Sequence, residues 1–233
     1  MIFPESEFRF IQRGFKDTLV LIPGWATDYR IFERIDLPYN YLLAVKFDCF
    51  KFKRQLRDEL NKRYMDKISL FGYSLGGFLA CEFAREHPAM VEELILVSMR
   101  KCYDAQTLQG VESRLIKNKR AYLREFYAAC FSAADKESFR WFKEHLLKDY
   151  IAGMELEGLA RGLDYLRKAR IGPGLFAGLR KIRIFHGEKD SIAPFQEAVK
   201  IKLNFPQADF ISLSSAGHLL FLKKEFKDNF QRP

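Results

Sequence analysis

The sequence has few of the residues that cross-link small proteins or bind metal ions. Its 233 residues include four cysteines, which lie far apart and form no C-x-x-C motif, and four histidines. None of the histidines stands at metal-ligand spacing from another histidine or from a cysteine. We therefore expect reduced thiols, most of them buried, and no metal site.

Long apolar segments are missing as well. No apolar run approaches the length of a membrane span. Residues 1–7 contain no basic segment followed by an apolar one, so we predict no signal peptide. Hydrophobic residues make up 48% and charged residues 30% of the chain, which is typical of a soluble globular protein. We expect a cytoplasmic protein with one large domain and room for an inserted subdomain.

Negative charge is in deficit. The formal net charge is +9, which predicts an acidic partner. Nucleic acid is one such partner, but the sequence contains no motif of a nucleic-acid-binding module. The catalytic motif described next favours a different explanation, and we expect no nucleic-acid binding.

One short motif organises the chain. Gly72-Tyr73-Ser74-Leu75-Gly76-Gly77 follows a run with β character at residues 67–71 and precedes a helical segment at 78–87. Strand, G-x-S-x-G and helix form the context of a nucleophile elbow, a sharp turn that holds a serine at the carboxyl end of a sheet. Ser74 is therefore the candidate nucleophile. The same pattern also occurs as a packing feature of strand–helix junctions.

The regions on both sides of this motif alternate between strands and helices. Apolar runs predict strands at residues 7–12, 17–22, 41–48, 67–71, 93–98, 181–187 and 208–213. Helical periods are found at residues 51–64, 78–87, 195–203 and 219–230. This alternation is typical of an α/β protein with a mostly parallel, doubly wound sheet.

The segment from residue 100 to residue 170 departs from this alternation. It contains no convincing strand, and its helical periods lie at 115–131, 138–150 and 155–169. Helices inserted between two strands of a sheet predict a lid or cap. We expect an α/β core, residues 1–99 and 171–233, and a helical insertion, residues 100–170.

Two further residues complete a candidate catalytic triad. A serine hydroxyl needs a nearby base, and His218 stands in a loop just after the last strand. Asp190 follows the preceding strand in the same way and can fix the tautomer of the histidine. Glu188 is a competing acid, and His186, inside the end of a strand, is interpreted as structural. The chain order serine, aspartate, histidine is that of hydrolases with such an elbow.

An oxyanion hole is expected beside the nucleophile. Its donors would be the backbone N–H of Leu75 and an N–H from the loop after the strand at 17–22, for which Trp25 is the candidate. As a large aromatic residue, Trp25 can also form part of the pocket wall. These groups predict acyl transfer from an ester to water, which requires no metal or organic cofactor.

Taken together, these motifs resemble the α/β-hydrolase superfamily over essentially the whole chain. The matching segments are Pro23-Gly24-Trp25, Gly72 to Gly77, Gly187-Glu188-Lys189-Asp190 with Pro194, and Gly217-His218. A closer resemblance is to the pimeloyl-acyl-carrier-protein methyl ester esterases of biotin synthesis, which share the G-W pair, the S-L-G-G elbow and the helical insertion. Pro23 stands where many of them have a histidine. The resemblance implies a serine carboxylesterase acting on the methyl ester of a carrier-bound pimeloyl chain.

The helical insertion carries much of the excess charge, with 15 Lys or Arg against 10 Asp or Glu. The basic residues that precede Glu125 without an intervening acid are Arg114, Lys117, Lys119, Arg120 and Arg124. On a continuous helix, Lys117, Arg120 and Arg124 share one face. Because acyl carrier proteins are acidic, Arg114 and these three residues are candidates for docking one. A solvated basic face explains them equally well.

The same triad serves several activities. A general carboxylesterase, a thioesterase, a C–C hydrolase and a perhydrolase would each act on a small substrate through these residues. A ligand receptor built on a hydrolase fold is an alternative of a different class. A substrate panel separates the enzymes from one another, and stoichiometric binding without repeated turnover would indicate the receptor.

Overall fold

A single, mostly parallel sheet runs through the protein, whose computed structural model describes residues 7–172 and 178–231. Seven strands occur in these residues, in the order β1-β3-β2-β4-β5-β6-β7. The strands are β1 (Glu7–Ile11), β2 (Thr18–Ile22), β3 (Asn40–Lys46), β4 (Ile68–Tyr73), β5 (Val91–Val97), β6 (Ile182–Gly187) and β7 (Asp209–Leu213). β1 pairs with β3 in antiparallel fashion, and the other neighbouring pairs are parallel. Each of the seven predicted strands is therefore present.

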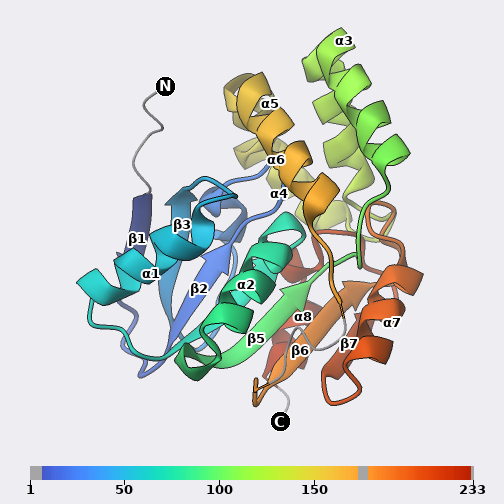
Figure 1. The fold of residues 1–233 in the computed structure, drawn as a ribbon. Coiled ribbons are helices and arrows are strands. Elements are labelled where there is room, and N and C mark those ends of the chain that lie inside the picture. Colours follow the sequence, from blue (N-terminus) through green and yellow to red (C-terminus); the bar gives the residue numbers. More distant parts are fainter. Residues whose placement is uncertain (1–6, 173–177, 232–233) are drawn as a thin grey trace.

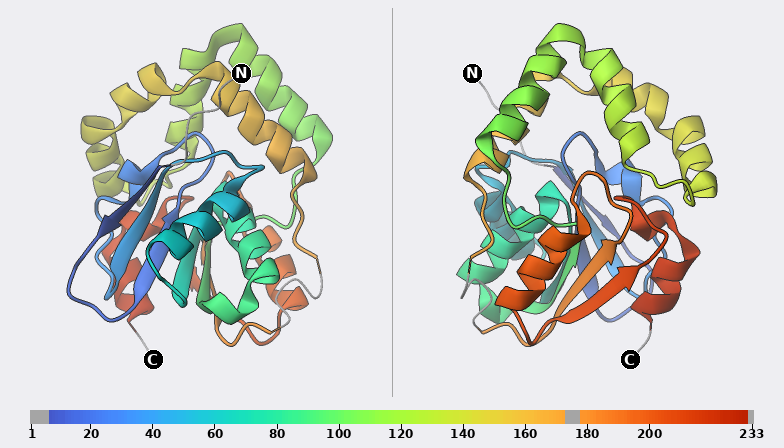
Figure 2. Two further views of the ribbon diagram at one scale, coloured as in Figure 1. Left: turned by 60° about the vertical axis from the view of Figure 1, so that its left-hand side comes forward. Right: turned by 90° about the vertical axis from the view of Figure 1, so that its right-hand side faces the viewer.

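Helices cover both faces of the sheet (Figures 1 and 2). Helices α1 (Phe52–Lys62), α2 (Leu75–Glu86) and α7 (Phe195–Asn204) lie on one face, and α8 (Lys224–Phe230) lies on the other. The short 3-10 helix η1 (Tyr29–Phe32) shares the face of α8. The predicted doubly wound α/β class is confirmed.

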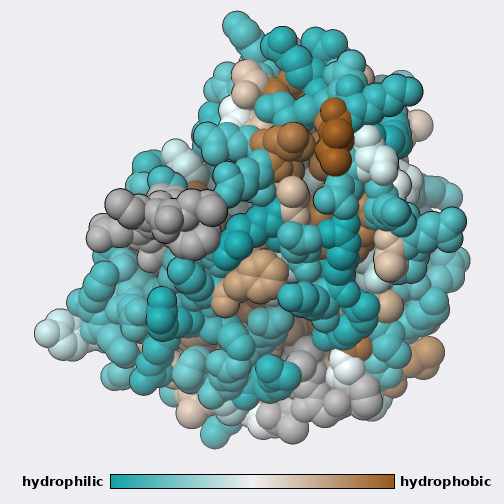
Figure 3. Space-filling view, turned by 45° about the horizontal axis from the view of Figure 1, so that its top comes forward, coloured by the Kyte–Doolittle hydropathy of each residue, from teal (hydrophilic) through white to brown (hydrophobic). Residues whose placement is uncertain are grey.

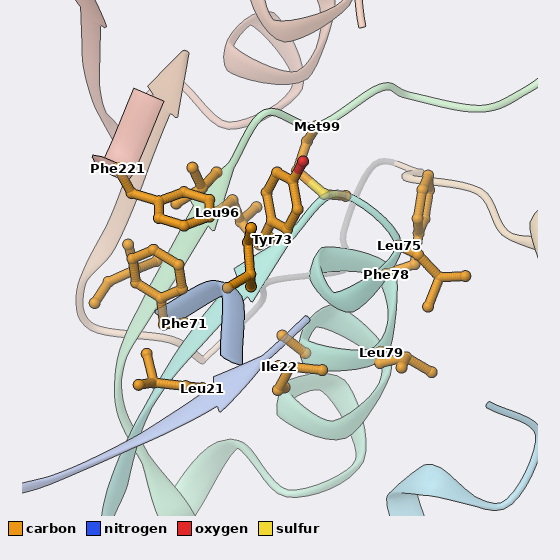
Figure 4. Packing of buried hydrophobic residues seen from close by; sticks show 14 of the residues in the cluster. Leu21, Ile22, Phe71, Tyr73, Leu75, Phe78, Leu79, Leu96, Met99 and Phe221 are labelled. Atoms are coloured by element: carbon orange, nitrogen blue, oxygen red, sulfur yellow. The ribbon is translucent and has the colours of Figure 1, made fainter. Parts of the chain in front are cut away.

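β4 lies in the middle of the seven-stranded sheet. Every residue of β2 and of β4 is buried, as expected for parallel strands that are covered on both faces. Figure 4 shows Phe71 and Phe221 on one face of β4, with Phe78 and Leu79 of α2 on the other. Each such side chain contributes roughly 1.5–3 kcal/mol when fully buried. The end of β4 is therefore a rigid platform for the residues that follow it.

The helical insertion, residues 100–170, lies over one edge of the sheet (Figures 1 and 2). It comprises α3 (Ala105–Ala129), α4 (Lys136–His145), α5 (Leu147–Gly153) and α6 (Leu156–Lys168), between β5 and β6. Its two connections to the core meet in an isolated antiparallel bridge between Cys102 and Arg170. The arrowheads of the parallel strands point toward it, so it covers the carboxyl edge of the sheet.

The first predicted helix of the insertion differs from the one observed. α3 begins ten residues earlier than predicted, after Asp104, whose Oδ1 accepts a hydrogen bond of 2.7 Å from the N–H of Thr107. It is also interrupted at Asn118, with φ −160° and ψ 88°. The Oδ1 of Asn118 accepts a hydrogen bond of 3.0 Å from the N–H of Ala121. Asn118 therefore acts as the N-cap of a second helical segment.

Two other predicted helices are also divided. The helix expected at 138–150 is two helices, because Leu146, with φ −123°, separates α4 from α5. The helix expected at 219–230 begins as the 3-10 turn η3 (Leu220–Leu222) and continues as α8. Apolar periodicity runs through both breaks, so it does not reveal them.

The structure also bears on three expectations from composition: the absence of a membrane span, a hydrophilic surface and reduced cysteines. In the ranges 7–172 and 178–231, no helix has both the length and the apolar character needed to cross a membrane. Figure 3 shows a face that is mostly hydrophilic, with hydrophobic residues in small groups. All four cysteines are free; Cys81 and Cys130 are buried, and Cys49 and Cys102 are partly exposed.

Candidate active site

The turn between β4 and α2 places Ser74 in a strained conformation. Its φ of 52° lies in the left-handed region that side chains rarely adopt. A Cβ on Gly72 would lie 2.5 Å from the Cα of Gly77, and a Cβ on Gly76 would lie 2.3 Å from the carbonyl oxygen of Ile22. Only glycine fits at these two positions. The tight packing of the turn therefore maintains the strain at the serine.

The three side chains of the predicted triad are in contact. The Oγ of Ser74 lies 3.1 Å from Nε2 of His218, and Nδ1 of His218 lies 2.7 Å from Oδ2 of Asp190. All three residues are buried, with exposed fractions of 7%, 1% and 6% for Ser74, His218 and Asp190. Because the Asp190 carboxylate accepts a hydrogen bond from Nδ1–H of His218, Nε2 is left as the acceptor that faces the serine. This is the connectivity of a Ser–His–Asp triad.

The turn after β6 orients Asp190. Its Oδ1 accepts hydrogen bonds from the N–H groups of Ile192, at 2.9 Å, and Ala193, at 2.8 Å. The other oxygen is thereby directed to the histidine. Glu188, the competing acid, is exposed and accepts a hydrogen bond from the Ser212 hydroxyl. Asp190 is thus the carboxylate that faces the base.

A second histidine lies beside the same carboxylate. His186 is fully buried in β6, and its Nε2 is 2.8 Å from the carbonyl oxygen of Ala193 and 3.6 Å from Oδ2 of Asp190. Because a carbonyl only accepts, Nε2 carries the proton, and Nδ1 has no partner among the described residues. Burial lowers the pKa of His186. The sequence placed His186 at the end of a strand but did not predict its proximity to Asp190.

The loop that carries His218 is held from two sides. On the core side, the Ser98 hydroxyl donates a hydrogen bond of 2.6 Å to the carbonyl oxygen of His218. On the insertion side, the N–H of His218 donates to the carbonyl oxygen of Cys130 at 2.8 Å. The N–H of Gly217 donates to Oδ2 of Asp135, also at 2.8 Å. Ser98, Cys130 and Asp135 were not predicted, because their contacts come from distant parts of the chain.

The two predicted oxyanion donors lie next to the nucleophile. Leu75 is the first residue of α2, so its N–H has no acceptor within the helix and lies at the positive end of the helix dipole. Among the described residues, no acceptor is found for the backbone N–H of Trp25. The loop that carries Trp25 is close to Ser74, since a Cβ on Gly24 would lie 3.1 Å from the Cβ of Ser74.

The side chain of Trp25 joins the core to the insertion. Its Nε1 donates a hydrogen bond of 2.9 Å to the carbonyl oxygen of Leu159 in α6, and its ring centroid lies 5.0 Å from that of Phe126. Trp25 and Leu75 also line a cleft of about 430 Å³ between the loop after β2, the end of β3 and the helices α5 and α6. This cleft is lined by the residues of both predicted oxyanion donors but not by the triad residues, so it is a candidate substrate pocket beside the triad.

Tyr103 is a further residue near the nucleophile. Burial raises the pKa of Tyr103 to about 12, and an interaction of its hydroxyl with the Ser74 side chain partly opposes this effect. The guanidinium of Arg100 lies 4.7 Å from the centre of its ring. The phenol therefore remains protonated at neutral pH. The segment before α3 carries no motif, so Tyr103 could not be predicted as a residue of the site.

The predicted docking residues occupy the surface of α3, but not one continuous face. Arg114 forms an ion pair with Glu125. Lys117 precedes the break at Asn118, whereas Arg120 and Arg124 follow it, so the prediction of one shared helical face is wrong. Lys117, Arg120 and Arg124 are exposed.

Sequence comparison relates the chain to curated esterases. No protein-family model matches it. It is 29% identical to a pimeloyl-acyl-carrier-protein methyl ester esterase of Legionella pneumophila (strain Corby), with 88% of each chain covered. It is 22% identical to the protein of that name from Nitrosomonas europaea, with 88% of this chain and 89% of the relative covered. The predicted resemblance is confirmed over most of the chain.

Solved structures show the same architecture. An esterase from Exiguobacterium antarcticum superposes with a TM-score of 0.80 at 17% identity and covers 97% of this chain and 94% of its own. A bromoperoxidase from Bacillus anthracis superposes with a TM-score of 0.80 at 18% identity and covers 96% of this chain and 92% of its own. The chain has the α/β-hydrolase fold. At these identities the likeness shows the fold alone.

Proposed function

We propose that this carboxylic ester hydrolase uses Ser74 as nucleophile, His218 as general base and Asp190 as the acid that orients the base. The observation that supports this assignment is the continuous chain of contacts, 3.1 Å from Ser74 Oγ to His218 Nε2 and 2.7 Å from His218 Nδ1 to Asp190 Oδ2. The first distance is within the reach that proton transfer requires, and the second is that of a hydrogen bond that orients the base.

Acylation would begin when Ser74 Oγ attacks the ester carbonyl carbon. The hydroxyl proton passes to Nε2 of His218, and the carboxylate of Asp190 stabilises the resulting imidazolium. The carbonyl oxygen becomes an oxyanion that accepts hydrogen bonds from the N–H groups of Leu75 and Trp25. Removal of one such donor typically lowers the rate by ~100- to 1000-fold. The C–O bond to the alcohol then breaks, and the alcohol leaves with the proton from Nε2.

Deacylation would repeat these steps with water. Nε2 of His218 takes a proton from a water molecule, whose oxygen attacks the acyl carbon. The same two N–H groups hold the second oxyanion, and the bond to Ser74 Oγ breaks as the serine recovers its proton. The products are a carboxylic acid and an alcohol. All proton transfers involve groups of this chain, the substrate and water.

For the substrate, we propose the methyl ester of an acyl chain bound to an acyl carrier protein, as in biotin synthesis. The name of the curated relatives supports a pimeloyl chain. The exposed side chains of Lys117, Arg120 and Arg124 offer positive charge to an acidic carrier. Arg114 is a weaker candidate, because Glu125 already neutralises it.

The first experiment tests the nucleophile. Replacement Ser74→Ala is expected to lower kcat for a short p-nitrophenyl ester by about 10,000-fold or more, because the attacking oxygen is lost. The melting temperature should change little, since the contacts of this hydroxyl are with other side chains of the site, those of His218 and Tyr103. An unchanged rate would exclude Ser74 as nucleophile.

The second experiment tests the carrier. Hydrolysis of the pimeloyl-carrier methyl ester is compared with that of the free p-nitrophenyl ester in the variant Arg120→Glu/Arg124→Glu and in the control Lys148→Glu, an exposed lysine of α5. We expect the double variant alone to raise KM for the carrier substrate by about tenfold, with the free ester unaffected. Equal preference for both esters in the unaltered protein would indicate a general small-ester hydrolase.

A further inference from the structure

The insertion contributes directly to the loop that holds the proposed base. Three of its residues form hydrogen bonds with residues 215–218 of this loop: Cys130, Ser132 and Asp135. The carbonyl oxygen of Cys130 accepts from the N–H of His218, and the Ser132 hydroxyl donates to the carbonyl oxygen of Ser215 at 2.5 Å. The position of the base therefore depends on contacts that span 82 and 83 residues of the sequence.

Asp135 is the centre of these contacts. It stands at the N-cap position of α4, where an aspartate usually accepts an N–H of its own helix, but its side chain makes no such bond. Instead, Oδ2 accepts from the N–H groups of Ser132, at 2.7 Å, and Gly217, at 2.8 Å. Oδ1 accepts from Nζ of Lys223 at 3.0 Å. The carboxylate is thus committed to the histidine loop and not to its own helix.

The fit around this loop leaves no room for adjustment. Asp135 is 5% exposed. A Cβ on Gly217 would lie 2.8 Å from the carbonyl oxygen of Cys130, 2.8 Å from the N of Ser132 and 3.0 Å from Oδ2 of Asp135. Because buried N–H groups need acceptors, loss of the carboxylate would leave the N–H of Gly217 unsatisfied next to the base.

We propose that Asp135 is a positioning residue for His218: its carboxylate fixes the loop 215–218 and thereby holds the imidazole within reach of Ser74. The proposal rests on the proposed function, in which His218 is the base. It also means that His218 is correctly placed only when residues 130–135 of the insertion are packed against the loop 215–218.

The test compares two double variants that differ in the side chain at residue 135, which keeps an acceptor oxygen in the first and has none in the second. In Asp135→Asn/Lys223→Gln, the amide oxygen can still accept from Gly217, and the two amide side chains can pair without a stranded charge. In Asp135→Ala/Lys223→Gln, the acceptor is gone. The control is Glu137→Gln, two residues away, which alters an exposed ion pair between the insertion and Arg34 of the core.

Activity is measured with a p-nitrophenyl ester and normalised to the number of sites that react with a fluorophosphonate. A displacement of the base of about 1 Å is expected to lower kcat of the alanine variant by roughly 10- to 100-fold, with KM nearly unchanged. The asparagine variant and Glu137→Gln should remain close to the unaltered protein. Equal kcat values for the two double variants would overturn the proposal.

A second readout does not depend on turnover. The proton shared by His218 Nδ1 and Asp190 gives a low-field NMR signal, which His218→Gln assigns among the four histidines of the chain. We expect this signal to shift or broaden in the alanine variant alone, and an unchanged signal would contradict the proposal. If the unaltered protein hydrolyses no ester, the proposed function fails, and the NMR signal still shows whether Asp135 positions His218.

Discussion

The core and the helical insertion hold the members of the candidate triad in different ways. Ser74 and Asp190 lie in turns that directly follow β4 and β6. Asp190 accepts hydrogen bonds from the N–H groups of Ile192 and Ala193 in its own turn, and the turn at Ser74 packs against the carbonyl oxygen of Ile22 in the core. His218 is held between the core and the insertion, by Ser98 on one side and by Cys130 and Asp135 on the other. The nucleophile and the acid are thus held by turns of the core, whereas the base depends on how two regions pack.

This difference teaches how an insertion can influence chemistry without containing a triad residue. The backbone N–H of Ser74 donates to Val97 of the core, whereas that of His218 donates to Cys130 of the insertion. Trp25 adds a second link, because its indole is bonded to α6 while its backbone belongs to the loop beside Ser74. Contacts that cross between the regions are therefore the most informative places to alter.

The largest contrast is expected between glycines of the two regions. Gly76→Ala places a Cβ 2.3 Å from the carbonyl oxygen of Ile22 and should lower the free energy of unfolding by about 3 kcal/mol or more. Gly110→Ala in α3 meets nothing within 4 Å and should raise it by about 0.5–1 kcal/mol. Urea unfolding measures both. Similar effects of the two substitutions would contradict the difference in packing.

An intermediate effect is expected for the link through Trp25. Trp25→Phe removes the hydrogen bond to Leu159 and part of the contact with α6, which should lower the free energy of unfolding by about 1–2 kcal/mol. Trp141→Phe is the matched control, because Trp141 is the second tryptophan and lies in α4 with no hydrogen bond from its indole among the described residues. Thermal unfolding of both variants checks the prediction. An equal loss in both would show that the bond to Leu159 contributes nothing specific.

The smallest effect concerns the pH dependence of stability in the core. Burial lowers the pKa of His186 below its usual value near 6.5, so the unfolded chain binds a proton at this residue more readily than the folded protein. The free energy of unfolding that comes from neutral His186 is fully present above pH 6.5. It is lost as the pH falls toward the lowered pKa of the folded protein, by up to about 1.4 kcal/mol per pH unit. His186→Gln should flatten this slope in urea unfolding between pH 7.5 and 5.5.

The same substitution at His145 provides a control for the loss of a histidine. His145 is exposed in α4 of the insertion, whereas His186 is fully buried beside Asp190. If His186→Gln and His145→Gln gave the same slope as the unaltered protein, burial of His186 would not account for the loss of stability in acid.

Local sequence patterns were sufficient to predict the strands and the turn that carries Ser74. The apolar runs of β2, β4 and β5 predicted buried parallel strands, because strands covered on both faces need continuous apolar sequence. The interruption at Asn118 was missed, although asparagine three residues before Ala121 is a recognisable N-cap signal. Asp135 also carried the signal of an N-cap, but its side chain turns to a loop far away in sequence.

The sequence by itself determined the order of strands and helices, the α/β class and the position of Ser74 in its turn, because these depend on periodicity and on backbone geometry within a few residues. Only the tertiary structure decided which groups surround the base. The contacts of His218 with Ser98 and Cys130, of Gly217 with Asp135, and of Asp190 with His186 depend on how the chain packs, and no sequence periodicity predicts them. They form because buried N–H groups and charges must find partners wherever the packed chain brings them.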